Sequence, residues 1–152
     1  MSRIILACAL AGILAVPAFG QGADPLIGTR KMNVEKSIAV GFQVDKGSTL
    51  IYTRDGQTIV NNYEIIDAKN QVLKGVLNHI YDGKPHASTG SPDTNATAYT
   101  RMGNTISWVR LQNGKPVFVG QGVIDGNTYT VMQGGINASN QPIYSVTVYD
   151  RQ

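Results

Sequence analysis

The chain has 152 residues, with 13 Lys and Arg against 10 Asp and Glu and a formal net charge of +3. This length is enough for one domain. The basic residues are scattered, with Arg30-Lys31 the only adjacent pair, which argues against a nucleic-acid-binding or anionic-membrane-binding surface. The single cysteine, Cys8, lies near the amino terminus, so the rest of the chain has no disulfide, thiolate zinc site or cysteine nucleophile.

Residues 1–20 have the pattern of a cleaved secretory signal. Arg3 precedes the uncharged apolar run Ile4–Val16, Pro17 breaks that run, and Ala18-Phe19-Gly20 supplies small residues at a cleavage site. The run is shorter than the ~20 residues that a membrane-spanning helix needs. We therefore expect an exported, periplasmic or extracellular protein that begins near Gln21 and has no membrane insertion after cleavage; a retained anchor is the alternative.

The first half of the mature chain reads as short strands. After a flexible lead-in at 21–25, a single domain is expected over 26–152. Alternation of Ile38, Val40, Phe42 and Val44 with small or polar residues predicts a strand with one buried face. The other strands expected here are Leu26–Val34, Leu50–Arg54, Thr58–Ile66 and Val72–Tyr81.

Two of these strands have a clear inner face. In Thr58–Ile66 the expected inward residues are Ile59, Asn61, Tyr63 and Ile65, because burial of an unpaired Glu64 on the other face would be costly. In Val72–Tyr81 the inward residues are Leu73, Gly75, Leu77, His79 and Tyr81. A long irregular segment, Lys84–Ala96, follows, and then a short strand, Ala98–Met102.

Thr105–Asp150 predicts an antiparallel meander with hairpin turns at Asn113-Gly114 and Asp125-Gly126. Regular short strands with tight turns and no amphipathic helical window indicate an all-β protein of about 8–10 short strands. We expect an up-and-down β-barrel, because sequential hairpins need no long crossover; a β-sandwich is the alternative.

The two turns also predict a register. A two-residue turn at Asp125-Gly126 pairs Ile124 with Asn127, Gly122 with Tyr129 and Gly120 with Val131. The turn at Asn113-Gly114 pairs Leu111 with Pro116 and Val109 with Phe118. The face expected to be buried comprises Val109, Leu111, Phe118, Ile124, Tyr129 and Val131. The opposite face comprises Trp108, Arg110, Thr128 and Thr130.

No pattern of catalytic or metal-binding residues is visible. His79 and His86 lie on different elements without a metal-binding motif, and no serine lies in a nucleophile elbow. Acidic residues fall mainly at turns, where turn formation explains them. We expect no catalytic residue, no metal and no cofactor, and hence no enzyme. His79 on an apolar face is most simply a hydrogen-bonded core histidine, with ligand contact as the alternative.

The inward faces bring together a set of aromatic side chains. They comprise Phe42, Tyr63, His79, Tyr81, Phe118 and Tyr129. Small barrels are filled by side chains or enclose one ligand, and an aromatic lining suits a small apolar or aromatic molecule. Gly75, Gly120 and Gly122 on the inward face leave room for a cavity or for curvature of the sheet. The sequence indicates no oligomeric state.

The sequence resembles a family of small secreted bacterial proteins described as lipocalin-like. Asp24-Pro25-Leu26-Ile27-Gly28-Thr29-Arg30-Lys31-Met32-Asn33 and Lys36-Ser37 are similar to the family opening D-P-x-x-G-T-W-K-L-N-x-x-K-S. Tyr81-Asp82-Gly83-Lys84 with Thr89-Gly90 matches its Y-D-G-K…T-G centre. Asn140-Gln141-Pro142 and Val148-Tyr149-Asp150-Arg151-Gln152 match its G-x-P…V-x-V-Y-x-K-Q ending. The resemblance implies an antiparallel barrel and no established activity; Arg30 stands where the family has tryptophan.

These observations favour a non-enzymatic exported barrel that binds a small apolar or aromatic ligand in its interior. The alternative is a structural or interaction module of the cell envelope. That alternative predicts a barrel filled by its own side chains and an exposed patch around Trp108.

Overall fold

The structure, a computed structural model, describes residues 24–41, 43–91, 93–136 and 139–152. The expected signal and the residues up to 23 lie outside this part of the chain, as does Phe42. Ten strands and no helix are present in the described residues, so no helix there could cross a membrane. The strands are β1 Gly28–Val40, β2 Gly47–Asp55, β3 Thr58–Ile66, β4 Val72–His79, β5 Pro85–Ala87, β6 Ala96–Met102, β7 Thr105–Gln112, β8 Lys115–Asp125, β9 Thr128–Ile136 and β10 Pro142–Arg151.

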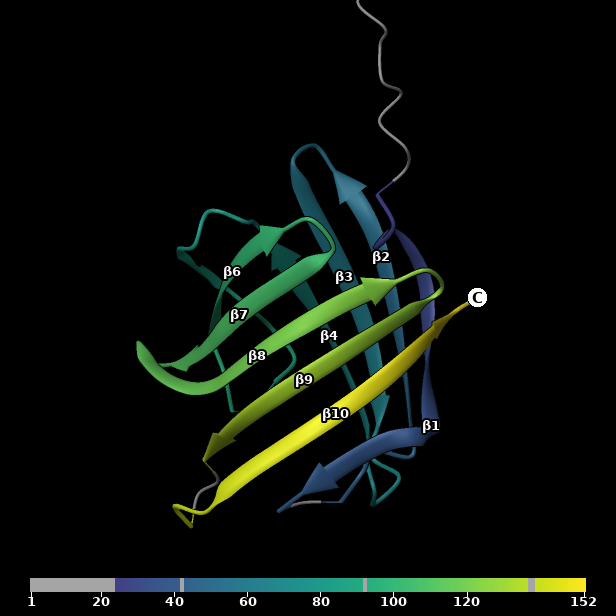
Figure 1. Ribbon diagram of the computed structural model, residues 1–152. Coiled ribbons are helices and arrows are strands. Elements are labelled where there is room, and N and C mark those ends of the chain that lie inside the picture. The colour runs from purple at the N-terminus through teal and green to yellow at the C-terminus, as the bar shows by residue number, and fades with distance from the viewer. Residues whose placement is uncertain (1–23, 42, 92, 137–138) are drawn as a thin grey trace, which may run out of the picture.

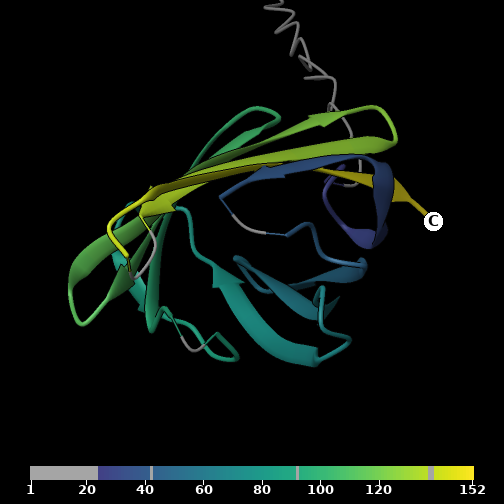
Figure 2. The same ribbon diagram turned by 90° about the horizontal axis from the view of Figure 1, so that it is seen from below.

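All ten strands belong to one antiparallel sheet, in the order β4-β3-β2-β1-β10-β9-β8-β7-β6-β5. Every neighbour in this order is also a neighbour in the chain, except that β1 pairs with β10. Pairing of the first strand with the last curls the sheet into a nearly closed barrel (Figures 1 and 2). The expected up-and-down barrel is therefore confirmed, and the sandwich alternative is wrong.

The seam of the barrel lies between β4 and the segment that leads from β5 to β6. The backbone N–H and the hydroxyl of Thr89 both donate to the carbonyl of Val76, at 3.4 Å each. The Tyr63 hydroxyl donates to the Thr89 carbonyl at 3.0 Å. Gly90, with φ of 89°, packs against Gly75 so closely that a Cβ on either residue would overlap the other strand or Tyr63. The Thr89-Gly90 pair therefore fastens the seam.

The residues just before β1 cover one end of the barrel, at the top of Figure 1. Leu26 is completely buried there. Asp24 forms ion pairs with Arg101 at 2.7 Å and Arg54 at 2.9 Å, which fix the segment to two strands. Burial and these two arginines act oppositely on the pKa of Asp24, and the net effect lowers it.

Residues 24–27 thus plug this end of the barrel, and Arg30 fills the space beneath them. Its side chain is 0 % exposed, and one terminal nitrogen donates to the Pro25 carbonyl at 2.6 Å. The guanidinium carbon lies 5.5 Å from the ring centroid of Tyr129. Arg30 thus occupies an interior position at this end of the barrel.

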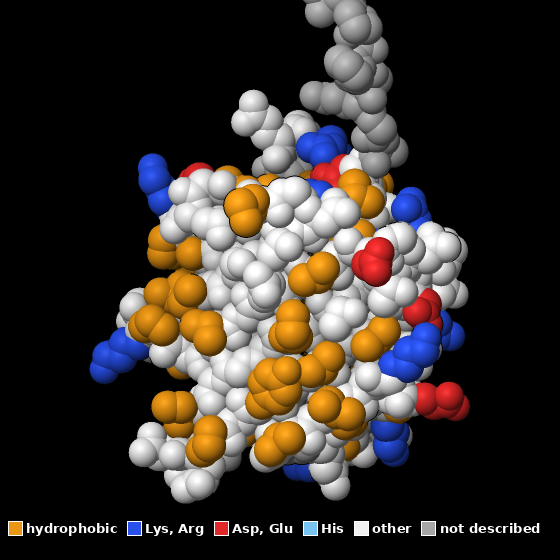
Figure 3. All heavy atoms as spheres, viewed as in Figure 1, with side chains coloured by type: hydrophobic (Ala, Val, Ile, Leu, Met, Phe, Trp, Pro, Cys, Tyr) orange, Lys and Arg blue, Asp and Glu red, His pale blue; other side chains and the backbone are white. Residues whose placement is uncertain are grey.

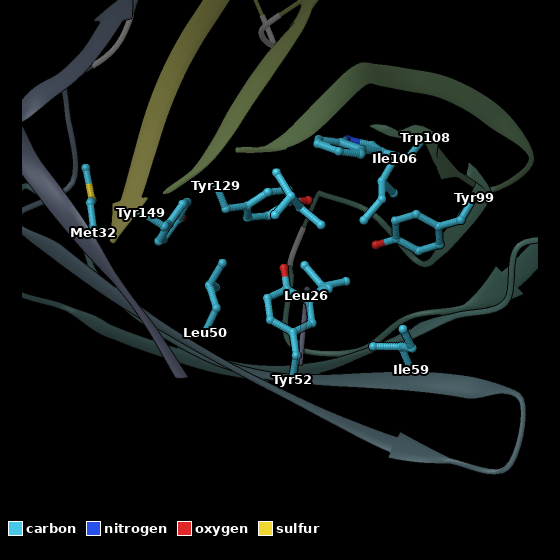
Figure 4. Close-up of a cluster of buried hydrophobic side chains, with 11 residues drawn as sticks. Leu26, Met32, Leu50, Tyr52, Ile59, Tyr99, Ile106, Trp108, Tyr129 and Tyr149 are labelled. Atoms are coloured by element: carbon cyan, nitrogen blue, oxygen red, sulfur yellow. The ribbon is translucent and has the colours of Figure 1, made fainter. Parts of the chain in front are cut away.

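The core is rich in tyrosine. Figure 4 shows Tyr52, Tyr99, Tyr129 and Tyr149 directed inward from different strands, with Trp108 beside them. Period-two alternation puts each of them on the inner face of its strand. Because every buried tyrosine carries a hydroxyl, this interior is both apolar and furnished with hydrogen-bonding groups.

The prediction of separate strands at Leu26–Val34 and Ile38–Val44 is wrong. β1 is one strand, and its pairing with β10 shifts between Asn33↔Val148 and Ile38↔Val146. The bulged strand has an odd number of extra residues there, so the inner and outer faces exchange. Ile38 and Val40 are consequently exposed, at 56 % and 59 %.

The register predicted for β8 and β9 is shifted by two residues. Ile124 pairs with Tyr129 and Gly122 with Val131, because the turn residues are Gly126-Asn127, with Gly126 at φ 54°. A shift of two leaves every side chain on its predicted face. Ile124 and Tyr129 are buried as expected, and the Tyr129 ring still covers Gly122.

The predicted faces of β7 are reversed. Leu111 pairs with Pro116 as expected, but Val117 is an extra residue, so that Phe118 faces Arg110 instead of Val109. One extra residue reverses the alternation. Trp108, expected outside, is 6 % exposed, whereas Val109 and Leu111 are only half-buried.

Candidate functional site

A cavity of about 220 Å³ lies inside the barrel. Strands β2, β3, β4, β6, β7, β9 and β10 contribute to its wall, together with part of the segment between β5 and β6. Its aromatic lining consists of Tyr52, Tyr63, Tyr99, Trp108, Tyr129 and Tyr149. Lining residues that are exposed to solvent, Leu73, Gly90 and Asp93, mark its mouth beside the seam.

The structure brings three of the six predicted ligand-binding residues to this cavity: Tyr63, His79 and Tyr129. Tyr81 is half-buried behind His79, with ring centroids 6.2 Å apart, and does not line the cavity. Phe118 is half-buried against Gly135 and also lies away from it. Phe42 lies outside the described residues.

The inward glycines leave no empty space of their own. A Cβ at Gly120 would overlap the Trp108 indole, and one at Gly122 would overlap the Tyr129 ring. A Cβ at Gly75 would overlap the hydroxyl end of Tyr63. Each glycine therefore makes room for an aromatic ring, and those rings form the cavity wall.

His79 is a neutral imidazole at the cavity wall. It is 3 % exposed and stacks on Tyr99, with centroids 4.1 Å apart and planes 14° apart. Burial, and then the positive charges of Arg110 and Arg101, lower the pKa of His79 to about 3. Neither ring nitrogen has a hydrogen-bond partner in the structure. The expected core histidine is thus inward, but its hydrogen-bonding groups are free.

The tyrosines of the cavity are neutral phenols. Burial raises the pKa of Tyr99 to about 12 and also raises the pKa values of Tyr52 and Tyr129. The hydroxyls of Tyr52 and Tyr129 are hydrogen-bonded to each other, and their rings meet edge to face at 6.2 Å. These phenols present uncharged hydrogen-bonding groups to the interior.

Arg110 is a cavity residue that the sequence interpretation placed on the outer face. It lines the cavity, is half-buried, and its Nε has no hydrogen-bond partner. The sequence signal for the reversal is Pro116, because proline cannot donate to a strand ladder and is found at bulges and edges. Without the bulge at Val117, alternation alone points Arg110 to solvent.

Two other buried polar atoms at the wall lack partners. They are the Asn61 Oδ1 atom on β3 and the Trp108 Nε1 atom on β7. Buried polar groups in folded proteins are nearly always hydrogen-bonded, to protein, water or ligand. The cavity therefore has an apolar aromatic wall, and several of its lining residues carry polar atoms without a hydrogen-bond partner.

No group of three or more His, Cys, Asp or Glu that could hold a metal ion occurs among the described residues. His86 and Asp82 form a surface pair at 3.0 Å, away from the cavity lining.

Comparison with known proteins shows a relationship of fold. No protein-family model matches the chain, and no curated protein matches it. Among solved structures, Echinococcus granulosus fatty-acid-binding protein 1 matches with a TM-score of 0.58 and 14 % identity, over 84 % of this chain and 97 % of that one.

Two further solved structures have the same fold. Zebrafish ileal bile acid-binding protein complexed with cholic acid matches with a TM-score of 0.56 and 10 % identity, over 85 % of this chain and 100 % of that one. A tyrosine-to-phenylalanine mutant of the REP1-NXSQ fatty acid transporter matches with a TM-score of 0.56 and 8 % identity, over 84 % and 98 %. All three are described as binding or transport proteins. The chain thus shares the up-and-down β-barrel fold of these three proteins.

Proposed function

We propose that this protein is an exported binding protein that holds one small, mainly apolar molecule inside its barrel and carries out no reaction on it. The observation that carries the proposal is the aromatic cavity of about 220 Å³ with its free polar atoms. Ligand sites are typically concave and apolar, with a few placed polar groups, and this cavity has both properties.

The volume limits the ligand. A cavity of ~150 Å³ can hold benzene, and sites for drug-sized molecules measure ~300–1,000 Å³. At about 220 Å³ the cavity lies between these values. It suits a molecule of one or two rings or a short branched chain.

The structural comparisons support a binding role. The matched proteins are described as binding fatty acids or a bile acid, and each match covers nearly all of the other chain. The same barrel architecture is thus used elsewhere for apolar ligands, whereas the residues of this cavity must determine what it accepts.

The alternative function, a structural or interaction module, predicted an exposed patch around Trp108, but Trp108 is buried. Another apolar surface is present on the outer face of β1 and β8–β10. Its most exposed members are Ile38, Val40, Val119, Ile136 and Tyr144. Apolar side chains are visible across the face shown in Figure 3. This surface keeps an interaction role as the second candidate.

Native mass spectrometry after mild purification tests the binding proposal. The wild-type protein is expected to carry a small co-purifying mass. Val131→Phe, which adds volume on the cavity wall, should remove that mass, whereas Met132→Phe on the adjacent outward position should retain it. An apo wild-type spectrum from a host shown to supply small aromatic and aliphatic metabolites would contradict the proposal.

Export has its own test. The full chain expressed in a bacterial host should be recovered outside the cytoplasm with an amino terminus near Gln21. Recovery of the intact chain starting at Met1 from the cytoplasm alone would contradict export and leave the binding proposal unaffected.

A further inference from the structure

We propose that the ligand is a compact organic anion, such as a one- or two-ring aromatic carboxylic acid, and that Arg110 binds its charged group. This inference rests on the proposed binding function and specifies the chemical class of ligand. It depends on the charge balance of the barrel interior.

The guanidinium of Arg110 has no negative partner in the described residues. The ion pairs there join Arg54 and Arg101 to Asp24, Lys74 to Glu64, and His86 to Asp82. Arg110 takes part in none of them, although its Nε atom is buried. A half-buried arginine usually has an anionic partner, because loss of hydration is unfavourable for a charge that nothing else compensates.

None of the ion pairs in the described chain joins a carboxylate to Arg110; Asp45, half-buried near Tyr149, takes part in none of them. Asp24 is held by two arginines at the plugged end. Asp93, the one carboxylate in the cavity lining, is exposed at the mouth and lies beyond ion-pair distance of Arg110. Arg30 adds a second buried cation beneath Tyr129. Arg110 in the cavity lining and the buried Arg30 thus place two positive charges in the interior, which disfavours a cationic ligand beside them.

Arg110 acts electrostatically across the cavity. Burial is the largest influence on the pKa values of Tyr63, Tyr99 and Tyr149 and raises them, and the charge of Arg110 opposes that rise at all three. The same charge adds to the lowering of the His79 pKa. An anion in the cavity would thus interact favourably with Arg110 at short range, in surroundings of low dielectric.

The neutral groups near Arg110 suit an oxygen-rich anion. Trp108 Nε1 is a donor only, and a neutral imidazole such as His79 can donate from one nitrogen. Both atoms are buried and unpartnered. A carboxylate accepts several hydrogen bonds and matches the fork of an arginine, so it is the anionic group that suits the side chain of Arg110 in the cavity lining.

The aromatic cavity wall favours a planar shape for the uncharged part of the ligand. The parallel stack of His79 on Tyr99 and the flanking indole of Trp108 present flat surfaces to the cavity, which favour a planar ring. A neutral planar molecule would displace water from Arg110 without replacing its hydration. A long-chain acid would exceed the cavity of about 220 Å³.

Isothermal titration calorimetry with three matched probes tests the inference: 1-naphthoate, 1-naphthalenemethanol and 1-naphthylmethylamine. The acid is expected to bind about tenfold or more tightly than the alcohol, as is typical of a hydrogen bond to a charged group, and the amine most weakly. Arg110→Gln should reduce the advantage of acid over alcohol to less than about threefold while leaving affinity for the alcohol nearly unchanged.

Two further variants distinguish loss of the Arg110 charge from a general effect of substitution on folding. Lys115→Gln removes an exposed cation from the neighbouring strand and should preserve the preference of the wild-type protein. Arg110→Lys retains the charge without the fork and should recover part of the preference.

The outcomes separate the two proposals. Equal affinity for acid and alcohol in the wild-type protein, or an unchanged preference in Arg110→Gln, would overturn the anionic ligand but leave interior binding intact. Tighter binding of palmitate than of naphthoate would overturn the compact class. If none of the four compounds binds, the anionic class is overturned, and the co-purifying mass in native mass spectrometry decides the binding proposal separately.

Discussion

Arg30 lies against Tyr129, with the guanidinium carbon 5.5 Å from the ring centroid, and so a completely buried cation supports the aromatic floor of the cavity. The pairing joins the plugged end of the barrel to the binding site. Arg30 donates one hydrogen bond to the Pro25 carbonyl, and the other two guanidinium nitrogens are unpartnered. The contribution of Arg30 to stability therefore depends on volume and ring contact more than on charge.

Substitutions at Arg30 should separate volume from charge. Arg30→Met keeps most of the volume and removes a buried cation, so the free energy of unfolding should change by less than about 1 kcal/mol. Arg30→Ala leaves a void beneath Tyr129 and should lower it by ~2–4 kcal/mol. Urea unfolding measures both, with Lys31→Met at the adjacent exposed position as a control. Equal, large losses of unfolding free energy in Arg30→Met and Arg30→Ala would show that the charge of Arg30, and not its volume, stabilises the fold.

His79 should make the protein sensitive to acid. Its pKa is about 3 in the folded state against 6.5 as the ordinary value. Between these values the unfolded chain binds a proton that the folded protein does not, so the contribution to stability is complete above about pH 6.5 and is lost as the pH falls toward 3. The slope attributable to His79 approaches ~1.4 kcal/mol per pH unit within that window.

Denaturant unfolding at pH 7, 6, 5 and 4 measures this slope. His79→Phe keeps a flat ring against Tyr99 and should flatten the dependence, whereas His86→Phe on the surface should not. An unchanged slope in His79→Phe would mean that other groups cause the loss.

Gly120 is expected to be intolerant of any side chain. A Cβ there would overlap the indole of Trp108, so Gly120→Ala should displace that ring and lower the free energy of unfolding by ~1–3 kcal/mol. Trp108, the only tryptophan of the chain, reports the change directly, because its buried indole should emit at short wavelength and shift to the red on displacement.

The matched control is Gly134→Ala on β9. The nearest atom to a Cβ at Gly134 is the Ile143 carbonyl oxygen at 3.5 Å, which is ordinary contact. Both stability and fluorescence should stay close to wild type. A red-shifted emission already in the wild-type protein would contradict the buried position of Trp108.

Tyr63→Phe should loosen the seam. It removes the 3.0 Å hydrogen bond to the Thr89 carbonyl, which is worth ~0.5–1.5 kcal/mol. Amide hydrogen exchange at Thr89, whose N–H donates to Val76, should become faster while exchange in β9 and β10 stays unchanged. Tyr144→Phe on the outer face is the control. Unchanged exchange at Thr89 would show that Gly75-Gly90 packing alone holds the seam.

The sequence by itself determined the class of fold and much of the inner face. Strict alternation in Thr58–Ile66 predicted Ile59 and Asn61 inside, and both are buried. Turn dipeptides located the hairpins. The register predicted at Gly126 was wrong by two residues, but every side chain stayed on its predicted face, because side-chain direction repeats with period two.

Only the tertiary structure decided which residues line the cavity. Odd numbers of extra residues in β1 and at Val117 reverse the alternation, turning Ile38 outward and Arg110 inward. The irregularity in β1 depends on pairing with β10, at the far end of the chain, and the bulge at Val117 on pairing within the β7–β8 hairpin; local periodicity encodes neither extra residue. Closure of the barrel by β1 and β10 likewise joins the two ends of the domain, and with them Arg30 and Tyr129.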